Sequence, residues 1–200
     1  MGARGGGRDG RARPWSAGAP IAAKPCHARV KVGRIAASIH AVAAERDYRD
    51  LVRSRVVLYD GGMGATLEQL ELTAEDYGGL AGKCHEALVL NRPDVIEGVH
   101  SSMLEAGADV VETDTFQASR LKLEEWGLAE HTREINVRAA QIARRAAGES
   151  RFVAGSIGPT GFLPASEDPA LGQITFGELV EVFAEQAGGL VEGGADLIII

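Results

Sequence analysis

The sequence predicts an α/β fold in which a parallel sheet is wrapped by helices. Short apolar runs alternate with longer segments whose apolar residues recur at helical spacing, as in repeated β/α units. A junction made of a helix end, a glycine and a buried strand also occurs twice, at residues 105–111 and 192–198. Four β/α units are half of an eight-stranded barrel, so we expect the N-terminal half of a (β/α)8 TIM barrel.

The composition excludes several classes of protein. Hydrophobic residues make up 45% of the chain, and no apolar run approaches the roughly 20 residues of a membrane span. The two cysteines provide no disulfide framework, so a cytoplasmic protein is expected. Residues 1–44 carry eight basic residues and one acidic residue, whereas residues 45–200 carry 13 basic and 27 acidic residues. This acidic body argues against a nucleic-acid surface.

The first 45 residues are expected to form a disordered basic leader. They are rich in Gly, Arg, Ala and Pro and have no apolar period, so they cannot bury a core. A targeting peptide and a basic binding arm stay open, but a leader without function is favoured. Residues 46–200 are expected to form one domain that is incomplete at its C-terminus. The reason is that residues 197–200 are predicted as a buried strand with no covering helix after them.

The predicted elements follow one another in strand–helix order. A short helix at residues 47–55 leads into a first strand at residues 56–60. Four apolar residues without alternation predict that this strand is covered on both faces. A later helix begins at Pro93, which suits a first helical turn, and ends at Gly107. The other predictions are helices at 65–72, 118–126, 130–147 and 175–192, strands at 108–115, 152–157 and 197–200, and loops at 73–87 and 158–173.

The first strand ends on Asp60, which two glycines, Gly61 and Gly62, follow directly. Ligands of parallel α/β folds bind at the carboxyl ends of the strands, and glycines let a ligand approach the backbone closely. An alternative is a plain turn in which Asp60 caps the next helix, and this stretch alone does not decide between the two. The stretch lacks the lysine of a phosphate loop and the third glycine of a dinucleotide fingerprint.

The second and third strands bring further polar residues to the same end. Glu112 and Asp114 flank Thr113 and share a face by the two-residue period of a strand. Buried carboxylates are costly without a cation or donors, so we expect a polar pocket with Asp60. The alternative is that Asp114 caps the following helix and Glu112 pairs with an arginine. With Ser156 at the third junction, the pattern suits an amino-acid-like ligand that carries an ammonium group.

No catalytic or metal-binding residues are predicted. Cys84, His85 and Glu86 are consecutive, and adjacent residues rarely chelate one ion. His100 lies near the apolar side of its helix and is predicted to be a packed or surface histidine.

Four motifs resemble those of the homocysteine-binding domain of cobalamin-dependent methionine synthases. The resemblance runs from about Arg46 to Ile200, and residues 75–79 and 174–176 favour methionine synthases over the smaller homocysteine methyltransferases. The four motifs occupy residues 60–66, 88–96, 105–116 and 153–160.

The resemblance implies a (β/α)8 barrel that binds homocysteine through zinc. In the family, zinc turns homocysteine into a thiolate that attacks a methyl group. The donor is methylcobalamin, which is recharged from 5-methyltetrahydrofolate on folate and cobalamin modules downstream. Asp60 matches the family aspartate that receives the substrate's amino group. The loops that begin at Thr113 and Gly158 match segments that line the pocket.

The departures from the family pattern predict a fragment. The three zinc-binding cysteines of the family lie on later strands and have no counterpart here, and a second substrate-binding glutamate would follow Ile200. We therefore expect that the chain alone binds neither zinc nor cobalamin tightly and is inactive. The alternatives are a homocysteine methyltransferase that uses betaine or S-methylmethionine, and a non-catalytic half-barrel binding module.

Overall fold

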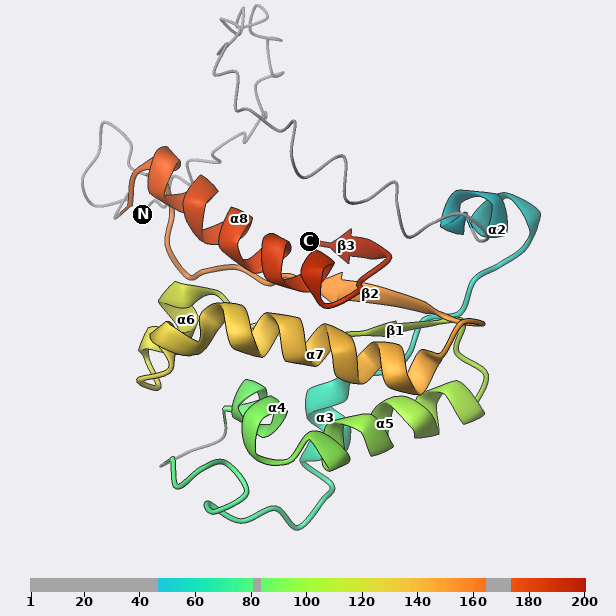
Figure 1. Cartoon of the computed structure of the whole chain (residues 1–200), viewed down its shortest axis with the longest axis horizontal. Coiled ribbons are helices and arrows are strands. Elements are labelled where there is room, and N and C mark those ends of the chain that lie inside the picture. Colours follow the sequence, from blue (N-terminus) through green and yellow to red (C-terminus); the bar gives the residue numbers. More distant parts are fainter. Residues whose placement is uncertain (1–46, 81–83, 165–173) are drawn as a thin grey trace, which may run out of the picture. The chain divides into compact units, whose positions relative to one another are not determined.

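The structure is a computed structural model that describes residues 47–80, 84–164 and 174–200. The predicted leader at residues 1–45 lies outside the described residues. In the described part, parallel strands alternate with helices, which confirms the predicted α/β class (Figure 1).

A parallel sheet of three strands forms the centre of the fold, in the order β1–β2–β3. Val111 pairs with Val153 across β1 and β2, and Gly155 pairs with Ile198 across β2 and β3. Each strand is shorter than predicted. Residues 197–200 were expected in a buried strand. In the described sheet, however, β3 is an edge strand and its side chains are only half-buried. The strands are β1 (Val110–Glu112), β2 (Phe152–Ser156) and β3 (Leu197–Ile199).

The prediction of a first strand covered on both faces is wrong. Residues 56–60 make only one parallel bridge, between Tyr59 and Val110, and the Asp60 N–H donates to the Val110 carbonyl oxygen at 3.0 Å. Val56 is 79% exposed and Leu58 is 54% exposed. The segment runs along the edge of the sheet, where it has one neighbouring strand among the described residues. The apolar residues of this segment therefore pack against the protein on one face only.

Helices follow the strands in the predicted order. Pro93 stands in the first turn of its helix, and Gly107 after the end of that helix has a φ of 111°. None of the described helices is long and apolar enough to cross a membrane. The α-helices are α2 (Tyr48–Ser54), α3 (Met63–Leu67), α4 (Leu88–Asn91), α5 (Pro93–Glu105), α6 (Arg120–Glu124), α7 (Thr132–Ala147) and α8 (Phe176–Glu192), and the 3-10 helices are η2 (His85–Ala87) and η3 (Ala129–His131).

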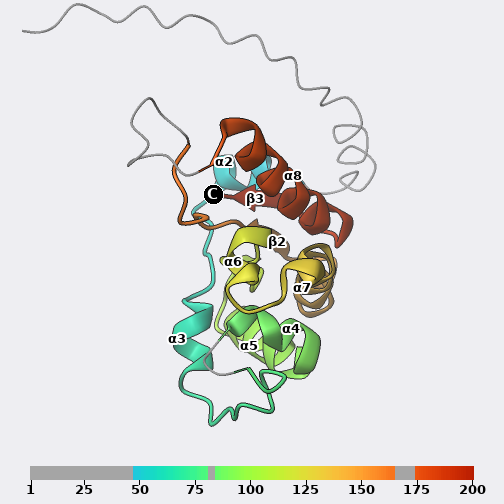
Figure 2. The same cartoon turned by 90° about the vertical axis from the view of Figure 1, so that its left-hand side faces the viewer.

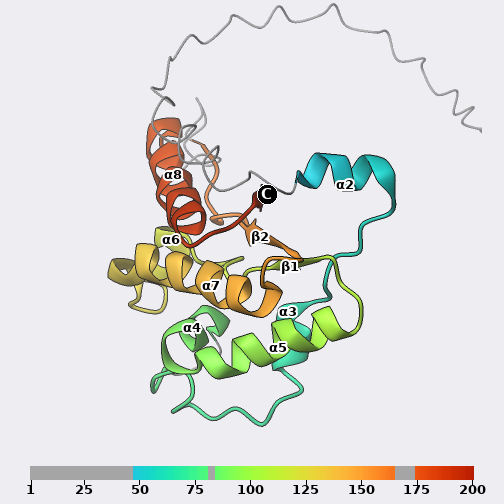
Figure 3. The same ribbon diagram turned by 45° about the vertical axis from the view of Figure 1, so that its right-hand side comes forward.

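Different helices cover the two faces of the sheet. Helix α7 lies between α5 and α8 (Figure 2), and its Ala143 packs against Val111 and Val153. Helix α2 lies across the strands from α5 and α7 (Figure 3), where its Tyr48 meets the ring of Phe152 edge-on at 5.5 Å. Because alternate residues of a strand face opposite sides, neighbouring residues of β1 and β2 contribute to separate cores.

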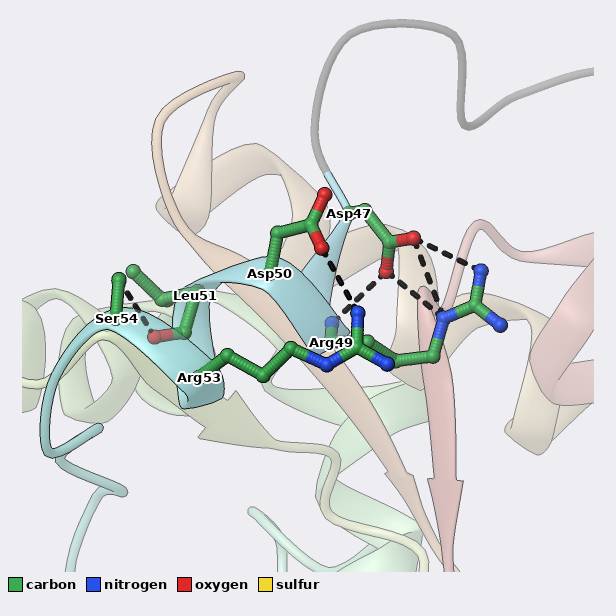
Figure 4. Close-up of polar contacts among 6 residues, drawn as sticks. All are labelled: Asp47, Arg49, Asp50, Leu51, Arg53 and Ser54. Atoms are coloured by element: carbon green, nitrogen blue, oxygen red, sulfur yellow. Dashed lines mark hydrogen bonds and ion pairs between the residues drawn. The ribbon is translucent and has the colours of Figure 1, made fainter.

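The polar contacts of α2 are mostly local. Asp47 caps the helix by accepting the Arg49 N–H at 2.8 Å, and Asp50 pairs with Arg53 one turn later at 3.0 Å (Figure 4). These ion pairs are exposed and add little stability. The helix is attached to the sheet by its apolar face and by the Tyr48 hydroxyl, which lies 2.8 Å from the Tyr59 hydroxyl.

The repeated sequence junction is also a repeated structure. The Asp109 N–H donates to the Leu58 carbonyl oxygen at 2.7 Å, and Oδ2 of the same aspartate accepts the Leu58 N–H at 3.0 Å. Asp196 makes the same two contacts with Val153, both at 2.8 Å. At each junction an aspartate therefore clamps the start of one strand segment to its neighbour and fixes the register.

His100 of α5 is fully buried, and neither of its ring nitrogens has a hydrogen-bond partner among the described residues. Burial lowers its pKa to about 4. The unfolded chain therefore takes up a proton near pH 6.5 that the folded chain takes up only near pH 4, so stability falls as the pH drops between these values.

We expect this linkage to remove about 2 kcal/mol of stability between pH 7 and pH 5. His100→Leu should therefore lose about 2 kcal/mol less free energy of unfolding than wild type between pH 7 and pH 5. Urea unfolding at both pH values measures the difference. His131→Leu is the control, because His131 is half-exposed and bonded to Glu134. The prediction would be contradicted if wild type and His100→Leu lost the same free energy of unfolding between pH 7 and pH 5.

Candidate functional site

A cavity of about 550 Å³ lies at the carboxyl ends of the strands. It is lined by residues at or just after the ends of the first strand segment, of β1 and of β2, and by residues around η2. The structure thus brings all of the sequence-predicted site residues to one cavity, although their role in binding stays a prediction. These residues are Asp60, Gly61, Gly62, Glu112, Thr113, Asp114 and Ser156.

Asp60, Glu112 and Ser156 are joined in one chain of hydrogen bonds. The Glu112 N–H donates to Asp60 Oδ2 at 3.0 Å, and Ser156 Oγ donates to Glu112 Oε2 at 3.1 Å. Burial raises the pKa of Asp60 to about 6. Within the described ranges neither carboxyl group forms an ion pair with Arg or Lys, so the suggested pairing of Glu112 with an arginine is not observed. This end of the cavity is suited to a cation.

The helix-cap alternatives are wrong. Helix α3 has Gly62 as its N-cap residue and no side-chain cap, so Asp60 does not cap it. Helix α6 is capped by Ser119, whose side chain accepts the Lys122 N–H, so Asp114 does not cap it either. Neither Asp60 nor Asp114 therefore serves as a helix cap, which was the structural alternative to ligand binding.

A buried polar network fixes the loop that carries Asp114. Thr115 Oγ1 donates to the Ser156 carbonyl oxygen at 2.7 Å and lies 2.6 Å from Thr113 Oγ1, which accepts the Ser156 N–H at 3.0 Å. Gln186 of α8 donates from Nε2 to the Thr115 carbonyl oxygen at 2.8 Å. The Thr113 hydroxyl thus stabilises the cavity wall. Gln186 was not predicted, because one glutamine in an amphipathic helix gives no signal of a partner 71 residues away.

Gly158 allows this loop to lie against the end of β2. Its N–H donates to the Phe116 carbonyl oxygen at 2.9 Å, and a Cβ at position 158 would lie 2.4 Å from the same oxygen. Only glycine fits this contact.

Cys84, His85 and Glu86 form a second part of the lining that sequence reasoning set aside. Glu86 is buried, accepts the Gln117 N–H at 2.8 Å and accepts the Cys84 thiol hydrogen at 3.7 Å. Burial raises the pKa of Cys84 to about 12. The available signal was a run of polar residues directly before the apolar residues 87–90, in a segment predicted as a loop.

The described residues do not fit a zinc site. Cys84 is the only cysteine among them, whereas the zinc site of the family uses three, and its thiol is bonded to Glu86. In the part of the chain that the structure describes, no three His, Cys, Asp or Glu residues are grouped so that they could hold a metal ion.

Known proteins resemble this chain in sequence and in fold. The methionine synthases of Mycobacterium tuberculosis (strain ATCC 25618 / H37Rv) and Mycobacterium leprae (strain TN) are each 37% identical to it over 162 residues. These residues are 78% of this chain but 13% of each relative, so the chain spans about an eighth of their length.

Among solved structures, two forms of the homocysteine methyltransferase MmuM from Escherichia coli share the fold. The match to the oxidized form has a TM-score of 0.60 at 24% identity, and it covers 77% of this chain and 56% of the MmuM chain. The match to the metallated form has a TM-score of 0.58 at 23% identity, and it covers 75% of this chain and 55% of the MmuM chain. At the level of sequence, the model of the homocysteine S-methyltransferase family matches residues 57–200. The chain therefore belongs to the homocysteine S-methyltransferase family.

Proposed function

We propose that this chain supplies the homocysteine-binding part of a methionine synthase. The observation that carries the proposal is the pair formed by Asp60 and Glu112, two carboxyl groups without a cationic partner in the described ranges, at the end of the cavity. A homocysteine ammonium group would neutralise them. Ser156 holds Glu112 by a hydrogen bond, and Gly61 and Gly62 leave the backbone open to the ligand.

The proposed fold is the first half of a (β/α)8 barrel. Three observations support it: the sheet is parallel, helices alternate with the strands, and the cavity lies at the carboxyl ends, where barrels bind their ligands. In the complete barrel, further β/α units would cover the face of the sheet that α2 covers only in part.

The proposed reaction transfers a methyl group to the homocysteine sulfur. After the homocysteine thiol has lost its proton, a lone pair on sulfur forms the new S–C bond. The bond between the methyl carbon and its donor breaks with its electron pair left on the donor, and methionine leaves. The residues described here bind and orient the amino-acid end and do not activate the sulfur. That step, together with zinc, methylcobalamin and 5-methyltetrahydrofolate, would belong to other parts of the protein. The 37% identity to methionine synthases favours this donor over betaine or S-methylmethionine.

Binding of L-homocysteine by the 200-residue chain tests the proposal. In calorimetry at pH 7.5, we expect Asp60→Asn to weaken binding about tenfold or more, because a charged hydrogen bond to the ammonium group is lost. Because the Asp60 pKa is about 6, binding by the wild type should also weaken as the pH falls below 6, when the carboxylate becomes neutral.

Asp50→Asn is the matched control, since it neutralises an exposed carboxylate on α2. 4-Mercaptobutanoate, which lacks the ammonium group, should bind weakly to wild type and to Asp60→Asn alike. Undetectable homocysteine binding by the wild-type chain, or equal binding by Asp60→Asn, would refute the proposal.

A further inference from the structure

Asp114 is a buried carboxyl group in the cavity wall that makes no side-chain hydrogen bond to any described residue. It is 6% exposed, and its Oδ2 atom is enclosed without a partner. The residue nevertheless lines the same cavity as Asp60 and Glu112. A buried polar group without a partner is costly, so its presence in a cavity wall points to a partner that binds there.

The surroundings of Asp114 disfavour a negative charge. Glu86 from η2 is also only 6% exposed and interacts with Asp114 electrostatically, and the Cys84 thiol and the Tyr77 phenol lie nearby. Asp60 and Glu112 face the same cavity. Among the described residues no Arg or Lys forms an ion pair with Asp114 or Glu86. Burial, and after it the charge of Glu86, raise the pKa of Asp114 well above its ordinary value.

The hydrogen bonds of Glu86 distinguish it from Asp114. Glu86 accepts hydrogen bonds on both of its oxygens, from the Gln117 N–H on Oε1 and from the Cys84 thiol on Oε2. Asp114 has no such donors. Burial and the charge of Glu86 thus favour the neutral form of Asp114, and no described residue accepts a hydrogen bond from its carboxyl group. A carboxylic acid kept neutral by its site can donate a hydrogen bond to a ligand.

We propose that Asp114 is a specificity-determining residue whose O–H group donates a hydrogen bond to the carboxylate of the bound amino acid. The inference rests on the proposed function, which places the ligand's ammonium group at Asp60 and Glu112. An amino acid carries both groups on one carbon atom, and Asp114 lies two residues after Glu112, with Cα atoms at most about 7 Å apart. An ionised Asp114 would repel the same carboxylate.

The test compares three ligands and two variants of the 200-residue chain by calorimetry. L-Homocysteine has the ammonium, carboxylate and thiol groups, L-2-aminobutyrate lacks the thiol, and 3-aminopropane-1-thiol lacks the carboxylate. Asp114→Ala removes the donor, whereas Asp114→Asn keeps a neutral donor of the same shape.

At pH 7, we expect Asp114→Ala to weaken binding of both carboxylate ligands about tenfold or more and to leave binding of the aminothiol unchanged. Asp114→Asn should bind all three ligands within about threefold of wild type. Because a ligand's own titration is the same for both proteins, raising the pH should weaken wild-type binding of L-2-aminobutyrate more than that of Asp114→Asn. This last comparison holds even if Asp114→Ala fails to fold.

Several outcomes would overturn the inference. An equal loss for all three ligands would make Asp114 a structural residue. A loss for homocysteine and the aminothiol, but not for L-2-aminobutyrate, would place the sulfur rather than the carboxylate at Asp114. The same pH dependence in wild type and Asp114→Asn would show that no proton is held there. Carbon-13 NMR of the Asp114 carboxyl group gives an independent readout. An ionised signal at pH 7 refutes the inference, whereas a protonated signal without binding of any ligand would refute the proposed function instead.

Discussion

Replacing Asp109 by alanine is expected to lower the free energy of unfolding by about 3 kcal/mol. Its buried carboxylate accepts two hydrogen bonds from Arg55, both at 2.7 Å, one from Arg151 at 2.9 Å and one from the Leu58 N–H at 3.0 Å. Removing one partner of a buried ion pair costs about 3–5 kcal/mol. The lower part of that range applies because Arg55 is 50% exposed and Arg151 is 38% exposed, so both can return to water.

The pH dependence of this contribution has a definite sign. The hydrogen bonds from Arg55 hold the pKa of Asp109 well below its ordinary value. The stabilisation is therefore fully present above about pH 4, the pKa of an unfolded aspartate, and is lost as the pH falls through the folded pKa. Asp109→Ala should for this reason lose less stability than wild type when both are acidified.

Urea unfolding at pH 7 and at pH 3 measures both effects. Asp50→Ala is the control, because the exposed pair of Asp50 with Arg53 should contribute less than about 1 kcal/mol. Asp196→Ala removes the equivalent clamp on Val153 and should also destabilise the protein. The prediction fails if Asp109→Ala unfolds within 0.5 kcal/mol of Asp50→Ala, a margin of about the size of surface effects.

The sequence predicted those features that neighbouring residues determine. Pro93 and Gly107 mark the ends of α5 because proline suits a first turn and glycine accepts a positive φ. The repeated Ala-Asp junction at Asp109 and Asp196 proved to be one structural device used twice. The cavity position of Asp60 was predictable too, because neighbouring residues show where a strand segment ends, and Asp60 lies at such an end.

Features that depend on distant parts of the chain were not predictable. The apolar residues 56–60 predict a buried strand, but how exposed that strand is depends on which elements lie beside it. Asp114 was assigned to the cavity without Glu86, because 28 residues separate them and neither pattern indicates the other. The Gln186 contact with Thr115 likewise depends on where α8 lies on the sheet. Periodicity shows that a face is buried but does not show what buries it.

Replacing Gly193 by alanine is expected to destabilise the protein by about 3 kcal/mol, because α7 leaves no room for a methyl group. Added at Gly193, a Cβ atom would lie 2.3 Å from the Val137 carbonyl oxygen and 2.7 Å from Ala140 Cβ. Both neighbours belong to α7, one of them backbone, so the two helices would have to separate. Since α8 also carries Gln186, the separation should disturb the cavity wall as well.

Gly188→Ala is the matched control, because Gly188 lies within α8 and Gly193 directly follows the end of the same helix. Its Cβ would meet only the end of Arg133, at 3.9 Å, so the substitution should stabilise the protein by about 0.5–1 kcal/mol through better helix propensity. Thermal and urea unfolding of both variants should therefore shift in opposite directions from wild type. If Gly193→Ala were as stable as Gly188→Ala, the close contact of α7 and α8 would not hold in solution, and the position assigned to Gln186 would be wrong with it.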